Sequence, residues 1–342
     1  MEKIRKQSLL IFACLLFISA VTMAGNKNRQ GTAGAQELLI PVGARGLSLG
    51  SSAIANASGI DAIYWNPAGV VRTESSVEAM FSQMQYIADI GVSYGALNVN
   101  AGSFGHLAFT IKSLSFGNIP RTTEDYPDGT GETFSPTFVT TGITYGKLLN
   151  DRISVGVTFN LIAEQIMSTS ATGMGINAGV QYNGLAIPEL KLGVVVKNIG
   201  PNMTYDGSNL YRFGTIEADR DAQYYKVEPA SFELPTTMEI GLAYEKKFGE
   251  QHNIALSTTF QNNNYSTDEY KFGGEYGYNN LLFIRGGYNI NPEADKDAQL
   301  FDYTFGFGLH FDLSGTIVAF DYAYRHTQFF DANSVVTVSL GF

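Results

Sequence analysis

Segments of about ten residues with a strict two-residue alternation recur along the chain from residue 75 to its end, and each is long enough for a tilted strand to cross a bilayer. In the segment 152–166, the alternate apolar positions are Ile153, Val155, Val157, Phe159 and Leu161. Side chains on a strand point alternately to opposite faces, so this pattern gives each segment one apolar face. The alternation predicts an all-β protein.

The second face of these segments is mainly Gly, Ser, Thr and Asn, which suits a crowded or water-filled lumen better than the charged surface of a soluble sandwich. We therefore predict a 14-stranded antiparallel transmembrane β-barrel. The expected strands are 76–84, 90–99, 103–113, 137–147, 152–166, 174–183, 190–199, 236–246, 252–261, 268–278, 281–290, 300–311, 315–326 and 334–342.

The lengths of the connections alternate, as they do in outer-membrane barrels. Even-numbered connections are short, and none exceeds six residues. The long connections 114–136, 200–235 and 291–299 are all odd-numbered. We expect the short turns and both ends of the barrel in the periplasm, and the long loops at the cell surface.

The N-terminus has the pattern of a secretory signal peptide, with a basic start, an apolar stretch from Leu9 to Val21 and small residues before Gly25. Cleavage is expected after about Ala24. Cys14, the single cysteine, lies inside this stretch, so a cleaved chain has no disulfide or thiol chemistry. The formal net charge of −10 also argues against nucleic acid as a partner.

The last strand ends SVVTVSLGF, with Val336, Val338, Leu340 and Phe342 on one face. An amphipathic strand that ends on Phe342 resembles the segment that the barrel-assembly machinery recognises in outer-membrane proteins. This resemblance implies a bacterial outer-membrane location, with outer-membrane lipid and that machinery as partners.

A barrel of fourteen strands is too wide for its own inward side chains to fill. Residues 25–75 lack alternation and are rich in Gly and Ala, so we predict an N-terminal extension and hatch there, ahead of a barrel at 76–342. Close packing is expected at Gly43, Gly46 and Gly50. The hatch or gate is expected at Trp65, Asn66, Pro67, Ala68 and Gly69, where Asn66 caps a turn and Pro67 takes its first position.

The stretch GARGLSLGSSAIANASGIDAIYWNPAG resembles the hatch of FadL-like outer-membrane proteins, whose Asn-Pro-Ala motif is matched by Asn66, Pro67 and Ala68. Within that superfamily it is most similar to the PorV/PorQ branch. The branch resemblance implies a role in type IX protein secretion, through secretion components or the C-terminal signal domains of exported proteins. The superfamily resemblance implies the alternative, uptake of hydrophobic small molecules across the outer membrane.

Ionisable residues expected to face the lumen are explained most simply by pairing across strands and with the hatch, where Arg45 and Asp61 are the expected partners. They include Lys112, Glu164, Glu239, Arg285 and Asp321. His106 and His310 are expected to be ordinary polar lining. No G-x-S-x-G or H-E-x-x-H segment occurs, and the acids of DYPDGTGE lack the spacing of a calcium loop. We expect no enzyme, cofactor or metal site.

Overall fold

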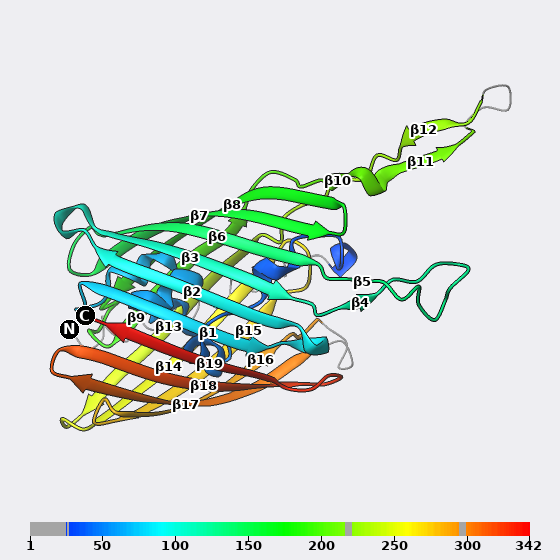
Figure 1. The fold of residues 1–342 in the computed structure, drawn as a ribbon. Coiled ribbons are helices and arrows are strands. Elements are labelled where there is room, and N and C mark those ends of the chain that lie inside the picture. Colours follow the sequence, from blue (N-terminus) through cyan, green and yellow to red (C-terminus); the bar gives the residue numbers. More distant parts are fainter. Residues whose placement is uncertain (1–24, 26, 216–220, 294–298) are drawn as a thin grey trace.

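The computed structural model describes residues 25, 27–215, 221–293 and 299–342, and its wall is a closed antiparallel barrel (Figure 1). Neighbouring strands follow one another around the wall, and pairing of β1 with β19 and of β8 with β9 completes the circle. The wall strands are β1 (Val77–Gln85), β2 (Gly91–Asn100), β3 (His106–Ser115), β6 (Thr137–Leu148), β7 (Ile153–Ile166), β8 (Thr169–Asn183), β9 (Leu190–Ile199), β13 (Thr237–Phe248), β14 (His252–Asn263), β15 (Glu269–Tyr278), β16 (Leu282–Ile290), β17 (Phe301–Leu313), β18 (Thr316–Thr327) and β19 (Asn333–Gly341).

The predicted barrel of fourteen strands is confirmed in the described part of the chain. The largest difference in a boundary is in β8, which begins at Thr169 rather than at 174. The sequence SATG at its start does not alternate in polarity, so the pattern alone could not extend the strand. The predicted signal peptide, 1–24 with Cys14, lies outside the described residues.

The two faces of the wall differ in chemistry as the alternation requires. On β7, Val157, Phe159 and Leu161 are exposed on the outer face, whereas Thr158 and Asn160 are buried on the inner face. Apolar side chains of this kind are exposed all around the barrel, far beyond the patch that a monomer exposes to water. This exterior suits the hydrocarbon core of a bilayer.

None of the helices in the described residues is long and apolar enough to cross a membrane.

The long connections lie at the end of the barrel opposite the C-terminus (Figure 1). They form structure that the sequence pattern did not predict, because its strands are too short to show alternation. One hairpin pairs β4 (Ile119–Pro120) with β5 (Thr133–Phe134). A second, projecting hairpin pairs β11 (Tyr211–Gly214) with β12 (Gln223–Lys226). Before it, β10 (Asp206–Gly207) pairs with β8, and the turn η8 (Ser208–Leu210) leads from β10 to β11.

The N-terminal segment lies inside the barrel as a series of short helical turns. They are η1 (Lys27–Arg29), η2 (Gln36–Leu39), α2 (Ala44–Ser48), η3 (Ala53–Ala55), η4 (Gly59–Asp61), α3 (Ala62–Trp65) and η5 (Pro67–Val71); η6 (Ile87–Asp89) and η7 (Gly102–Phe104) lie in connections of the wall. Apolar residues of the N-terminal segment, such as Leu47 and Val70, pack on inward-facing apolar residues, such as Val335 and Met80. The main core therefore lies between the hatch and the wall.

Candidate functional site

Residues 44–71 of the hatch, which we call the belt, follow the inner wall and fit against a ring of inward-facing glycines. A Cβ atom at Gly179 would lie 2.0 Å from Asn66 Oδ1, and one at Gly156 would lie 2.2 Å from the Pro67 carbonyl oxygen. Side-chain carbons do not approach other atoms this closely, so only glycine leaves room for the belt. The ring comprises Gly146, Gly156, Gly179, Gly193, Gly241, Gly273, Gly287 and Gly306.

The motif from Trp65 to Gly69 is held against the wall by Asn66, which is fully buried. The Asn66 amide donates to the carbonyl oxygens of Ile54 at 3.0 Å and Val180 at 3.2 Å. Its Oδ1 accepts from the Ala68 amide at 3.1 Å, and Pro67 begins the turn η5. The asparagine therefore joins two parts of the belt to β8. A gating role for this motif stays a prediction.

Of the three hatch glycines predicted to allow close packing, Gly46 and Gly50 lie at tight contacts, whereas a Cβ atom at Gly43 would lie 3.6 Å from Asp61. Gly46 faces Trp65, where a Cβ atom would lie 2.2 Å from the indole ring. Gly50 has a φ of 62° and lies against the backbone of Phe272 and Tyr288. Gly43, with a φ of 81°, lies just before α2 and the belt. A left-handed φ favours glycine at both positions.

A charge network joins the belt to four strands at the end of the lumen nearest the C-terminus. Arg45 of α2 lies 3.2 Å from Glu275, which Arg285 contacts at 2.6 Å. Arg285 also pairs with Asp321, and His310 lies 3.2 Å from the same carboxylate. These groups are mostly buried, so each charge depends on its partners.

Asp61 of the belt lies near this network. Burial raises the pKa of its carboxyl, and the charge of Arg45 opposes that shift.

The other predicted lumen charges also find partners. Lys197 pairs with Glu239 at 2.7 Å across neighbouring strands. Lys112 donates to the carbonyl oxygens of Glu37 at 2.6 Å and Ile40 at 3.3 Å. Glu164 is buried and accepts from the Tyr205 hydroxyl. These contacts are consistent with a structural role for the lumen charges.

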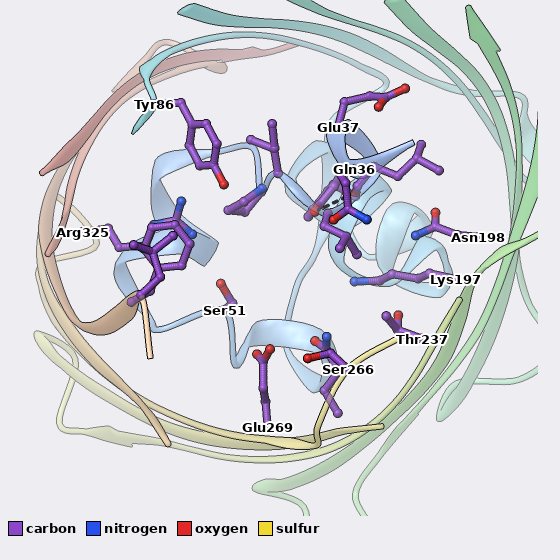
Figure 2. A pocket seen from close by; sticks show the side chains of 18 of the residues that line it. Gln36, Glu37, Ser51, Tyr86, Lys197, Asn198, Thr237, Ser266, Glu269 and Arg325 are labelled. Carbon is purple, nitrogen blue, oxygen red and sulfur yellow. Dashed lines mark hydrogen bonds between the residues drawn. The ribbon is translucent and has the colours of Figure 1, made fainter. Parts of the chain in front are cut away.

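A cavity of about 570 Å³ lies inside the barrel, between the hatch and the wall (Figure 2). Apolar and aromatic side chains such as Ile90, Phe116 and Phe138 line part of it. Polar groups line the rest, including the Lys197–Glu239 pair. The cavity therefore offers an apolar wall for a ligand body and a polar wall for a single polar group.

Two residues of this cavity were missed in the sequence. Arg325, only 5% exposed, donates to Asn333 Oδ1, and its guanidinium lies 3.6 Å from the centre of the Phe301 ring. Glu37 of η2 is among the lining residues, although its carboxyl points toward the barrel wall (Figure 2). Arg325 continues the inward phase of its strand, so the alternation contained a signal for it. Glu37 had only the weaker signal of one acid in the apolar run QELLIPV.

A second cavity, of about 370 Å³, lies on the other side of the hatch and has a charged lining that includes Arg45, Asp61 and Lys191. Hatch residues line both cavities, so the hatch separates them. The described residues contain no group of three or more His, Cys, Asp or Glu side chains placed to hold a metal ion.

No protein-family model matches the sequence, and no curated protein matches it either. Three solved structures are similar in fold at low sequence identity. The CymD monoaromatic hydrocarbon channel has 14% identity and a TM-score of 0.55, covering 89% of this chain and 98% of that chain. The Pseudomonas putida toluene transporter TodX has 14% identity and a TM-score of 0.54, covering 87% and 97%.

The third is the Ralstonia pickettii toluene transporter TbuX, with 13% identity and a TM-score of 0.51, covering 88% of this chain and 98% of that chain. All three are channels or transporters rather than enzymes. The resemblance to the PorV/PorQ branch stays a prediction. The chain shares the barrel fold of these hydrocarbon channels and toluene transporters.

Proposed function

We propose that the protein is an integral outer-membrane channel that takes up small hydrophobic molecules. The observation that carries this proposal is the cavity of about 570 Å³ inside the barrel, with an aromatic wall next to the long loops. The apolar exterior of the wall and the fold shared with hydrocarbon channels support it. This is the alternative function that the superfamily resemblance implied.

The cavity suits transient binding. Burying an apolar group as large as a Phe side chain contributes roughly 1.5–3 kcal/mol, part of which offsets the loss of the ligand's freedom. A toluene-sized molecule in a cavity of about 570 Å³ leaves space unfilled, so its contacts are incomplete. Weak binding of this kind allows release, which a transport channel requires.

The test is uptake of labelled toluene at low concentration by cells that lack the protein, compared with cells in which it is restored. Phe116→Ala combined with Phe138→Ala removes two rings that pack at 4.9 Å on the cavity wall. Phe109→Ala, which removes a ring from the outer face, is the matched control. We expect the double variant to lose most of the restored uptake and the control to keep it. Equal uptake with and without the protein would refute the proposal.

A second function, the secretion role implied by the branch resemblance, is favoured by the projecting hairpin. Phe213 and Tyr224 lie opposite each other on β11 and β12, with exposed fractions of 64% and 74% and ring centres 5.0 Å apart. An exposed aromatic pair on a cell-surface loop is typical of a protein-binding surface.

The test of this second function is a mild-detergent pull-down from native outer membranes. It compares the wild type with the double variant Phe213→Ser, Tyr224→Ser. Secretion components, or exported proteins that share a C-terminal domain, should appear with wild type only. If hydrophobic molecules copurify without protein partners, the secretion role is rejected and uptake remains the supported function.

A further inference from the structure

Residues 33–42, which we call the strap, precede the belt and form part of the cavity wall. The cavity is lined by every residue from Gln36 to Pro41. Gly43, with a φ of 81°, follows the strap, and Ala35 within it has a φ of 48°, a left-handed conformation that is strained for alanine. None of the eight ring glycines has a strap residue among its closest contacts. The strap is therefore held by different contacts from those that hold the belt.

The first set of contacts joins the strap to the hairpin base, by which we mean the residues that flank the projecting hairpin in the connection 200–235, among them Tyr205, Phe232 and Glu233. Ala33 forms a parallel bridge with Glu233, whose carbonyl oxygen accepts from the Gly34 amide at 3.0 Å. Arg29, just before the strap, pairs with the Glu233 carboxylate. The Phe232 ring covers Gly34 so closely that a Cβ atom there would lie 2.0 Å from it. The strap and the hairpin base thus form one paired unit.

The second set is a buried cluster where strap, wall and hairpin base meet. Glu37 of the strap is 2% exposed and Glu164 of β7 is 3% exposed. Tyr205 of the hairpin base donates to Glu164. Lys112 of β3 donates to backbone carbonyls of the strap, so its hydrogen bonds do not reach the Glu37 carboxyl. Neither Glu37 carboxyl oxygen has a hydrogen-bond partner among the described residues.

Glu164 Oε1 also lacks a hydrogen-bond partner among the described residues, and its carboxyl lies close enough to that of Glu37 for their charges to interact. Two buried carboxyls placed in this way cannot both be ionised without large repulsion. A proton removes one charge and gives one carboxyl a hydrogen to donate to the other. We propose that Glu37 and Glu164 share a proton that holds the strap against the hairpin base and β7, in the position where the strap forms part of the cavity wall, and that loss of this proton releases the strap. Release of the strap would regulate how a ligand reaches the cavity, so this inference rests on the proposed function.

The direction of the effect follows from linkage. Burial, and next the charge of Glu164, raise the pKa of Glu37 from 4.5 to about 7, while Lys112 opposes the shift. A released Glu37 in solvent returns to its ordinary value. The closed state is therefore most favoured below about pH 4.5, weakens as the pH rises, and reaches its minimum above about pH 7. The full change in the equilibrium is on the order of 10²-fold.

Strap release can be measured by labelling a cysteine at Leu39, a strap residue on the cavity wall, with a small maleimide added to the intact outer membrane. Thiol reactivity itself rises with pH, so each rate is divided by that of Glu124→Cys, an exposed position in the long connection 114–136. We expect the ratio to rise by at least tenfold between pH 5 and pH 8. With Glu37→Gln added, the ratio should stay low and independent of pH, because a neutral amide can donate to Glu164 at every pH.

Glu164→Gln is a second variant that removes the repulsion from the other side. Glu37 stays ionisable and buried in it, so the rise should become smaller than in the wild type without disappearing. A disulfide between Ala33→Cys and Glu233→Cys should abolish the rise until it is reduced. Heat-modifiable migration on gels checks that each barrel is folded. A ratio that is flat in the wild type, or a rise that persists at full size in both glutamine variants, would overturn the inference.

Labelled toluene uptake, measured over the same pH range, separates this inference from the proposed function. If uptake requires the protein, and neither uptake nor the labelling ratio depends on pH, the channel is retained and the shared proton is rejected. If labelling rises with pH but toluene uptake never requires the protein, the shared proton is retained and hydrocarbon uptake is rejected.

Discussion

The Asn66 side chain offers the sharpest test of how the hatch is held. Asn66→Ala removes three hydrogen bonds of 3.2 Å or less, two donated to Ile54 and Val180 and one accepted from Ala68, besides a longer one of 3.5 Å to Val194. The Ile54 carbonyl keeps a second donor, Gln181 at 3.1 Å, so it is not left without a partner. At about 1 kcal/mol for each bond, loss of all three destabilises the local fold of the belt by roughly 2–4 kcal/mol.

A loss of that size raises the population of a locally open belt by roughly 30- to 1,000-fold, since 1.4 kcal/mol corresponds to a factor of ten. Hydrogen exchange measures this directly, as faster exchange in peptides from 66–71 while strand peptides remain protected. Leakage of small solutes from liposomes should increase as well. Asn100→Ala, which removes one exposed turn hydrogen bond, is the matched control. Unchanged protection in 66–71 would refute the view that Asn66 anchors the belt.

Three further perturbations follow from the same contacts. Arg285→Met leaves Glu275 and Asp321 without their shared guanidinium and should cost about 3–5 kcal/mol, seen as a lower thermal midpoint, whereas Lys191→Met at a partly exposed pair should cost at most about 1 kcal/mol. Gly179→Ala places a methyl group 2.0 Å from Asn66 Oδ1 and should reproduce the faster exchange of Asn66→Ala, while Gly214→Ala, whose methyl group would make an ordinary 3.7 Å contact with the Tyr225 ring, should not. Phe342→Ser should slow assembly of the barrel but leave its folded wall intact, because the ring is 55% exposed and the Phe342 amide still bonds to Val77; an unchanged assembly rate would contradict the role of the terminal Phe.

The wall was predictable because its strands repeat one simple pattern. Val157 and Phe159 face out while Thr158 faces in, and lipid outside with a polar lumen inside imposes this alternation on every strand. The hairpins β4–β5 and β11–β12 were missed because two to four residues per strand are too few to show alternation.

The path of the hatch was only partly predictable. The glycines Gly156 and Gly179 were visible as small residues on the polar face of their strands, but alternation cannot say that they accommodate Pro67 and Asn66. Such contacts join residues about ninety to more than a hundred positions apart, and only the closed wall brings them together. The Glu37–Glu164 pair was missed for the same reason, since nothing local to either residue indicates the other.

The two parts of the hatch differ in how readily they can move. Withdrawal of the belt would break the contacts of Asn66, expose apolar side chains such as Leu47 and Val70, and separate the belt from all eight ring glycines. Withdrawal of the strap breaks the bridge to Glu233, the hydrogen bonds from Lys112 and the contact between two carboxyls, and it exposes the side chains of Leu38 and Ile40. The smaller loss is at the strap, and part of it disappears when a proton leaves. We therefore expect the belt, with its Asn-Pro-Ala motif, to act as the fixed plug, and any gate to lie in the strap and the hairpin base to which it is paired.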